Sequence, residues 1–555
     1  MNKHLSVSYL FVSLLVITAS CKTETEDLKT NSLKPNILLI VADDMGYSDI
    51  APFGGEINTP TLGKLANQGV MLTNFHVLPT CSPSRSVLLS GTDNHIAGLG
   101  SMVEFLTPKQ KGNPGYEGYL NNTVAHLPQI LNDAGYHTYM SGKWHLGLEE
   151  NNWPSHKGFS ETFALLPGGG SHWADKLPLS PPQTMNYVKN GKLVSDLPED
   201  FYSTKNYTDY ILEWLERDKK EEKPFFAYVS YTAPHDPLHA PKNYIDKYKG
   251  KYDAGFDALR TERFESLKRL GIISDSTNLP PLKGMNWGDL PEEAKQGSAR
   301  DMEVYAAMIE YMDDQISRIF KWLEANDEMD NTMIVFLSDN GANGAMNTSY
   351  PGQTEAYLSS FDNSLDNRGL PGSYIEMGPA WASASMSPHR LFKAFTTEGG
   401  IISPCIIKLP ESINQNQVNK AFTHISDIMP TFLELARAEH PSKQNDAIPG
   451  MMGKSLFPLL KGDVEAVHLN EGIGYELHGL RAYIKDEWKI INLPKPFGKG
   501  DWALFNLLKD PAESIDLSDQ FPEKRAELIA AWEAYSTNVG VVFDPLDVQS
   551  ILKPD

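Results

Sequence analysis

The segment Ile-Leu-Leu-Ile-Val-Ala-Asp-Asp, residues 37–44, decides the class of fold. Its first six residues are apolar on both faces of an extended chain, which indicates a strand buried between two layers of helices. Similar runs recur at residues 225–229 and 333–337. Helical stretches alternate with these runs, at residues 61–68, 124–134, 207–217 and 299–325. The alternation predicts an α/β domain with a central, mostly parallel sheet between helices.

Polar side chains follow each of these buried runs, and also the segment 136–140, where the strands are expected to end. They are Asp43, Asp44, Lys143, His145, His235, Asp339 and Asn340. In an open α/β sheet, ligands bind beyond the carboxyl ends of the strands, so these side chains are expected to meet at one edge. Asp and Asn are also common in turns, and any one of these residues alone would be weak evidence. Several strand ends together favour a site.

The pattern changes after about residue 410. The later segments are a helix at 425–438, short strands at 480–484, 488–491 and 502–506, and a final helix at 523–535. They predict a smaller C-terminal domain in which an antiparallel sheet packs against a helix. We therefore expect a catalytic domain at residues 34–460 and a C-terminal subdomain at residues 461–555.

The composition narrows the classes of partner. Hydrophobic residues make up 41% of the chain and charged residues 22%, as in ordinary globular proteins. Acidic side chains outnumber basic ones by 71 to 49, which gives a formal net charge of -22. Such a surface repels the nucleic-acid backbone, so no nucleic-acid partner is expected. An acidic protein that binds an anion needs a local concentration of positive charge.

The N-terminus has the pattern of an export signal. A short apolar run ends in small residues just before Cys21, which predicts a signal peptide at residues 1–20 and a polar tether at 21–33. Cys21 resembles the acceptor of a bacterial lipoprotein, although Thr18 stands where a branched apolar residue is usual. An ordinary cleaved signal with an incidental Cys is the alternative. We expect an exported protein of the bacterial periplasm, outer membrane or cell surface, with a lipid anchor at Cys21.

The two remaining cysteines lie in different surroundings. Cys81 begins the run Cys-Ser-Pro-Ser-Arg, in which Pro83 favours a helix start and Arg85 offers a rigid positive fork. A group at a helix N-terminus can stabilise an anion, but a buried Cys with Arg85 in a surface ion pair fits the residues equally well. Cys405 lies in an apolar run, where Cys is a small hydrophobe. A disulfide between the two is the alternative in an exported chain.

A family resemblance decides between these readings. Cys-Ser-Pro-Ser-Arg resembles the sulfatase signature Cys-x-Pro-x-Arg. The similarity continues through Gly-Lys-Trp-His-Leu-Gly at 142–147, Thr-Ala-Pro-His at 232–235 and Phe-Lys-Ala-Phe-Thr-Thr-Glu-Gly-Gly at 392–400. The similarity covers nearly the whole mature chain, with the motifs in the same order. The chain resembles bacterial arylsulfatases of the Pseudomonas type. The resemblance implies an alkaline-phosphatase-like fold and hydrolysis of small-molecule or glycan sulfate esters.

The resemblance also implies a set of site residues. The catalytic residues would be Cys81, Arg85, Lys143, His145, His235 and Lys393. Cys81 would be oxidised to formylglycine by a sulfatase-maturing enzyme. A calcium ion would be held by Asp43, Asp44, Asp339 and Asn340, whose ligand atoms are all oxygens, as Ca²⁺ prefers. Zinc would be expected to recruit His or Cys.

The resemblance assigns roles within this set. Asp339 would help to activate the nucleophile, while Arg85 and Lys143 would offset charge on the sulfate. His235 and Lys393 would serve the leaving oxygen, and His145 would remove a proton during sulfate release. Nearby His172, His239 and Glu398 are candidates for pocket or supporting residues. The loops at 171–182 and 346–387 are expected to set specificity.

Three other functions remain open from the sequence. A phosphonate monoester hydrolase or phosphodiesterase would share the metal and the tetrahedral-anion chemistry. A non-catalytic lipoprotein that binds sulfate or glycans would be expected to have lost some of the matched residues, and none is missing. An extracellular scaffold would leave the polar residues at the strand ends unexplained.

Overall fold

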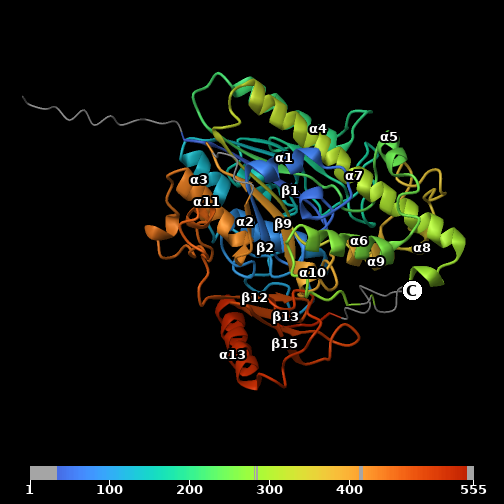
Figure 1. Cartoon of the computed structure of the whole chain (residues 1–555). Coiled ribbons are helices and arrows are strands. Elements are labelled where there is room, and N and C mark those ends of the chain that lie inside the picture. The colour runs from blue at the N-terminus through green and yellow to red at the C-terminus, as the bar shows by residue number, and fades with distance from the viewer. Residues whose placement is uncertain (1–33, 281, 283–285, 412–416, 547–555) are drawn as a thin grey trace, which may run out of the picture. The chain divides into compact units, whose positions relative to one another are not determined.

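The computed structural model describes residues 34–280, 282, 286–411 and 417–546 (Figure 1). The predicted signal peptide at 1–20, the tether at 21–33 and Cys21 lie outside the described residues. Within the described part, no helix combines the length and the apolar character needed to span a lipid bilayer. Cys81 and Cys405 are both buried and free, so the alternative of a disulfide between them is wrong.

The large sheet has β1 (Asn36–Ala42) near its middle, and every residue of β1 is buried. The other strands are β2 (Val70–His76), β3 (His137–Lys143), β4 (Glu161–Leu165), β5 (Tyr187–Lys189), β6 (Lys192–Leu193), β7 (Phe225–Ser230), β8 (Thr332–Ser338), β9 (Ile402–Lys408), β10 (Gln417–Asn419) and β11 (Thr423–His424). Their order is β10-β2-β9-β8-β1-β7-β3-β4-β5-β6, and β11 also pairs with β2. Strands β8, β1, β7, β3 and β4 run parallel, whereas β9 is antiparallel to both its neighbours. The predicted mostly parallel sheet is confirmed.

Helices lie on both sides of this sheet, in two groups (Figure 1). One group contains α1 (Pro60–Gln68), α4 (Ser203–Asp218) and α7 (Glu292–Ala325), and the other contains α2 (Cys81–Ser90), α3 (Leu127–Asp133) and α11 (Ile428–Leu435). Shorter or peripheral helices are α5 (Lys242–Ile245), α6 (Phe256–Arg269), α8 (Glu355–Leu358), α9 (Gly378–Ser385), α10 (Glu398–Ile401) and α12 (Phe457–Leu460). Both faces of the parallel strands are therefore covered, which explains why those strands are apolar throughout.

One predicted helix is shorter than expected. The segment 124–134 becomes helical only at Leu127, and Pro128 occupies its first turn. Proline lacks an N–H group and is tolerated in the first turn, where that donor would have no partner inside the helix. The apolar pattern upstream of Leu127 belongs to a buried loop instead.

The C-terminal sheet is antiparallel, with strands β12 (Gly472–Leu477), β13 (Leu480–Lys485), β14 (Trp488–Asn492) and β15 (Trp502–Asn506) in that order. Helix α13 (Pro522–Val539) packs on it (Figure 1). Leu528 and Trp532 of α13 form a small core with Ile490, Trp502 and Leu504 of the sheet. The predicted small sheet packed by a helix is confirmed.

Buried charges join the two sheets. The ammonium group of Lys489 on β14 lies 2.7 Å from Glu398 and 2.8 Å from Glu513, and His76 on β2 lies 2.9 Å from Glu398. Breaking such a buried pair typically costs about 3–5 kcal/mol, because one charge is left without its partner. Glu398 therefore serves the junction between the sheets, and it is absent from the lining of the site pocket described below.

Strand register explains why polar residues distant in sequence meet. Ala42 at the end of β1 pairs with Ser338 at the end of β8, and Gly142 of β3 pairs with Ser230 of β7. The carboxyl ends of these adjacent parallel strands are therefore level. Strand β2 runs in the same sense as β8, since both are antiparallel to β9. The chain leaving β2 thus reaches the same edge and begins α2 there.

Candidate active site

The candidate nucleophile is Cys81, the first residue of α2. Its side chain is buried, and its Sγ lies 3.7 Å from Oδ1 of Asp44. The turn before the helix is fixed by Ser84, whose hydroxyl accepts from Leu78 N–H at 2.9 Å. Burial raises the pKa of the Cys81 thiol well above its ordinary value. Because the thiolate is the reactive form, the unmodified side chain is a poor nucleophile here.

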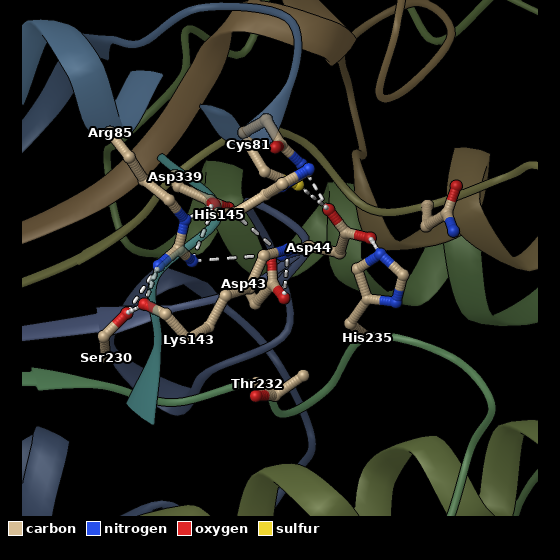
Figure 2. Close-up of polar contacts among 12 residues, drawn as sticks. Asp43, Asp44, Cys81, Arg85, Lys143, His145, Ser230, Thr232, His235 and Asp339 are labelled. Atoms are coloured by element: carbon tan, nitrogen blue, oxygen red, sulfur yellow. Dashed lines mark hydrogen bonds and ion pairs between the residues drawn. The ribbon is translucent and has the colours of Figure 1, made fainter. Parts of the chain in front are cut away.

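Three carboxylates at the strand ends face three cationic side chains. Figure 2 shows the carboxylates together with two of these cations, Arg85 and Lys143. The closest contacts are Lys143 to Asp43 at 2.7 Å, Lys393 to Asp44 at 2.7 Å, and Arg85 to Asp339 at 2.8 Å. All six side chains are almost completely removed from solvent. Arg85 is further fixed because its Nη1 donates to the hydroxyl of Ser230 and to the carbonyl of Lys143. The three cations are balanced by the three carboxylates, so the cluster by itself carries no excess of positive charge.

Burial and neighbouring charges act differently on these groups. Burial opposes ionisation of Asp43, but Lys143 and the surrounding cations outweigh it and lower the pKa of Asp43. Burial raises the pKa of Asp339 to about 6, even though Arg85 opposes that shift. Crowded carboxylates of this kind repel one another unless a further positive charge is present.

The same residues suit a hard divalent cation. Ligand atoms of Asp43, Asp44, Cys81 and Asp339 all lie within 4.8 Å of one another. Oδ1 of Asn340 is buried at the same place and has no hydrogen-bond partner among the described residues. Asp44 has a φ of 65°, a left-handed conformation that L residues rarely adopt and that is often found at functional sites. Three carboxylates and an amide oxygen fit the oxygen coordination of calcium or magnesium.

Two histidines flank this cluster in contrasting electrostatic settings. Nε2 of His235 lies 3.3 Å from both Oδ2 of Asp44 and Nζ of Lys393. Burial disfavours the charged form of His235, but Asp44 outweighs it and the pKa is raised. His145, with its Nε2 3.3 Å from Glu104, has a lowered pKa because burial outweighs the carboxylate. One ring is thus biased toward the acid form and the other toward the base form.

The other two candidate histidines lie behind the site. Nε2 of His172 is 3.0 Å from the carbonyl oxygen of His235, and its Nδ1 is 2.7 Å from Ser203 Oγ. Nε2 of His239 is 3.0 Å from the carbonyl oxygen of Ser373. Neither ring lines the pocket. His172 therefore supports the backbone that carries His235.

A pocket of about 340 Å³ opens over Cys81. Its polar lining includes His145, His235 and Lys393. Its walls are mostly apolar and include Met102, Val103, Phe105, Leu148, Leu179, Pro181, Pro182, Ala345, Pro351 and Ala394. The predicted specificity loops 171–182 and 346–387 supply part of this wall.

Several pocket residues were not found by sequence reasoning. Glu104 and Phe105 come from a short 3-10 turn, and His478 comes from the β12–β13 turn of the C-terminal sheet. Ser230 and Tyr228 hold Arg85 from β7. Ser230 could have been noticed at a strand end, but nothing in the sequence marks Glu104 or His478. The predicted site residues, by contrast, all come together at the carboxyl edge of the sheet.

The site thus combines a buried candidate nucleophile at a helix start with paired carboxylates and cations at the carboxyl edge of an α/β sheet, an arrangement that suits hydrolysis of an anionic ester. Comparison with known proteins gives the family. Residues 35–438 match the family described as "Sulfatase", and residues 388–532 match "N-sulphoglucosamine sulphohydrolase, C-terminal". The chain belongs to the sulfatase family and is a sulfuric ester hydrolase.

Two relatives and one solved structure illustrate the similarity. An uncharacterized sulfatase of Schizosaccharomyces pombe is 44% identical over 539 residues, covering 94% of this chain and 96% of the relative. An arylsulfatase of Klebsiella aerogenes is 40% identical over 428 residues, covering 76% and 91%. The crystal structure of Ps i-CgsB in complex with k-i-k-neocarrahexaose has a TM-score of 0.65 at 23% identity, covering 91% of this chain and 93% of that one. The structural likeness supports the fold alone.

Proposed function

We propose that this sulfuric ester hydrolase cleaves sulfate monoesters of apolar, chiefly aromatic, alcohols. Its nucleophile would be formylglycine made from Cys81, and its metal would be calcium. The observation that carries the proposal is the position of Cys81, between a buried cluster of charges and the apolar pocket. The arylsulfatase of Klebsiella aerogenes supports the aryl assignment.

Charge accounts for anion binding at the base of the pocket. Asp43, Asp44 and Asp339 together balance Lys143, Lys393 and Arg85, so a divalent ion would leave the site with an excess of positive charge. A sulfate monoester is an anion and would be held by that excess. The guanidinium fork of Arg85 and the ammonium of Lys143 are rigidly placed and suit the oxygens of a tetrahedral anion.

The two histidines would divide the proton transfers. His235, whose pKa is raised by Asp44 despite burial, lies beside Lys393 and can donate a proton or hydrogen bond to the departing ester oxygen. His145, whose pKa is lowered by burial, can accept a proton at neutral pH. Two groups of the same kind with opposite shifts are a common basis for acid and base assignments.

The pocket wall supports an apolar leaving group. Phe105 and His478 face each other there, with ring centroids 5.5 Å apart. Burial lowers the pKa of His478 to about 4, so its ring is uncharged at neutral pH. Lys393 belongs to the charged cluster, and the described residues of the wall above it include no further lysine or arginine. A polysulfated chain would find no partner for its additional charges on this wall.

Calcium would be held by Asp43, Asp44, Asp339 and Asn340, whose oxygens suit a hard ion. When bound, it supplies a Lewis acid that offsets charge on the sulfate oxygens. Elemental analysis of active enzyme is expected to find calcium, and Asp339→Asn is expected to lose both the ion and turnover. Active enzyme that holds zinc, with neither calcium nor magnesium, would contradict this assignment.

Formylglycine at position 81 would supply a hydrated aldehyde as the nucleophile. Cys81 is only 1% exposed in the folded protein, so a maturing enzyme would need to reach it before the surrounding structure closes. Peptide mass spectrometry across residue 81 is expected to show an aldehyde in active enzyme. Full activity in protein that retains only the thiol would exclude the modification.

Substrate comparison tests the reaction itself. Matched 4-nitrophenyl sulfate and 4-nitrophenyl phosphodiester substrates would be assayed on modified, calcium-loaded enzyme. Sulfate ester cleavage is expected to have the higher kcat/KM. A preference for the phosphodiester would favour the phosphodiesterase alternative.

A further inference from the structure

The ring of His145 is held by several separate features of the chain. His145 follows β3 with a φ of 53°, a left-handed conformation unusual for a non-glycine residue. A side chain at Gly168 would lie 2.7 Å from Cε1 of the imidazole, so the glycine lets the ring approach the backbone.

Glu104 provides the polar contact at one edge of this ring. Its Oε2 lies 3.3 Å from Nε2 of His145, and its side chain is 24% exposed. The residue belongs to the short turn Val103–Phe105, which forms part of the pocket wall. At the opposite edge of the ring, Nδ1 is buried and has no hydrogen-bond partner among the described residues.

The pair selects one tautomer of His145. Burial disfavours ionisation of Glu104, but His145 outweighs it and lowers the pKa of the carboxyl group, which is therefore charged at neutral pH. An ionised carboxylate only accepts hydrogen bonds, so the neutral ring must place its proton on Nε2. The lone pair then lies on Nδ1.

The geometry points to Glu104 as a positioning residue that accepts the Nε2–H of His145 and leaves Nδ1 as the free proton acceptor of the site. Only one part of this inference rests on the proposed function, namely that Nδ1 accepts a proton during the reaction. A carboxylate that orients a histidine in this way fixes the tautomer and stabilises the ring after it gains a proton. Among the described residues, Glu104 forms no hydrogen bond or ion pair with the charged cluster or with Cys81.

The other charged groups near His145 lower the pKa of its ring, whereas Glu104 raises it. Lys143 on β3 and Arg85 on α2 both disfavour a second positive charge on the ring, whereas Glu104 favours it. The remaining ionisable groups of the pocket lining are Cys81, His235, Tyr350, Lys393 and His478. Removal of the negative charge of Glu104 should therefore lower the pKa of His145 further.

Histidine NMR on the full, metal-loaded chain tests the pair without relying on turnover. In protein labelled with 15N-histidine, the His145 signals are assigned by their loss in His145→Asn. We expect a protonated Nε2 and an unprotonated Nδ1. Glu104→Gln should give a mixture of tautomers and a lower pKa for this ring. A wild-type ring protonated on Nδ1, or no change in tautomer and pKa in Glu104→Gln, would overturn the inference.

Kinetics supply the second readout. Glu104→Gln is expected to lower kcat about 10- to 100-fold, part of the ~10²–10⁴-fold that a general base contributes. The acidic limb of its pH profile should move to lower pH, and Glu104→Asp should restore the wild-type limb at least in part. Phe105→Leu, from the same turn, is the matched control: it should change KM but leave the acidic limb in place.

The two readouts separate the inference from the proposed function. If no sulfate ester is cleaved but the NMR tautomer depends on Glu104, the inference stands and the proposed substrate is wrong. If sulfate esters are cleaved while Glu104→Gln and Phe105→Leu have identical pH profiles, Glu104 is only a wall residue and the inference fails.

Discussion

The base and the wall of the pocket differ in how the chain builds them. The base holds Cys81 and the charged cluster, and most of its residues stand at or just beyond the ends of adjacent strands. The wall comes from loops near residues 102–105, 179–183 and 345–351 and from a turn of the C-terminal sheet. Rigid neighbouring strands can place charged groups within tenths of an ångström, whereas loops can vary in shape without disturbing them. The base should therefore govern the reaction and the wall should govern which ester is accepted.

The largest expected effect separates the two buried cysteines. Cys81→Ala should lower kcat/KM for 4-nitrophenyl sulfate by at least ~10⁴-fold, because loss of a nucleophile removes the covalent route. Cys405→Ala removes a cysteine that is also completely buried, but on β9 away from the pocket, and should retain activity. Thermal unfolding would verify that both variants fold. Equal loss of activity in both variants would contradict the assignment of Cys81 as the source of the nucleophile.

A series of sulfate esters with different leaving groups tests the proton donors proposed at the base of the pocket. His235→Ala and Lys393→Ala should steepen the dependence of kcat/KM on the pKa of the leaving alcohol. The loss should approach ~10²–10⁴-fold for alkyl sulfates, since an alkoxide needs a proton, and should be smaller for nitrophenyl sulfate. His145→Ala should instead show an initial burst of phenol followed by slow turnover. If His145→Ala steepens the series and His235→Ala does not, the two histidine roles are reversed.

The wall should give a smaller and more selective effect. His478→Ala and Phe105→Ala each remove one side of an aromatic contact, which is typically worth about 0.5–1.5 kcal/mol. KM for aryl sulfates should therefore rise roughly two- to tenfold. Inhibition by inorganic sulfate, which needs only the base, should stay unchanged and serves as the control. A parallel loss of sulfate inhibition would mean that base and wall are not independent.

The smallest effect on turnover is expected from substitution of a residue that supports the wall of the pocket without lining it. His95 lies 3.0 Å from Asp93 and 3.3 Å from Glu476 on β12, the strand that leads to His478. Burial opposes its charge, but these carboxylates outweigh it and raise the pKa of His95 to about 9. The folded-state pKa is above the unfolded value of about 6.5, so the stabilisation is complete below pH ~6.5 and is lost as the pH rises through ~9.

Thermal unfolding between pH 6 and 10 measures this contribution, expected to be roughly 3 kcal/mol. His95→Gln should lose the part of the pH dependence that falls between pH 6.5 and 9. His156→Gln replaces an exposed histidine and should retain the wild-type dependence. Identical curves for wild type and His95→Gln would show that the ion pair does not stabilise the junction.

The sequence predicted the central strands well because a strand covered on both faces must be apolar throughout. The runs at 37–42, 225–229 and 333–337 all fall within strands of the large sheet. The predicted start of one helix was wrong, because a loop precedes Leu127 where a helical turn was expected. Glu398 shows that a local motif can also suggest the wrong location for a residue. Its motif suggested the pocket, but its partner Lys489 comes from the C-terminal part of the chain.

The sequence by itself determined the α/β class, the strand-end residues and, through the family resemblance, the chemistry expected of them. Each of those features is local: a run of apolar residues, a polar residue after it, or a short motif around Cys81. Only the tertiary structure decided that Glu104 lies against His145 and that His478 reaches the pocket from another sheet. Those contacts join residues far apart in the chain, and their partners are chosen by strand order and packing rather than by any local pattern.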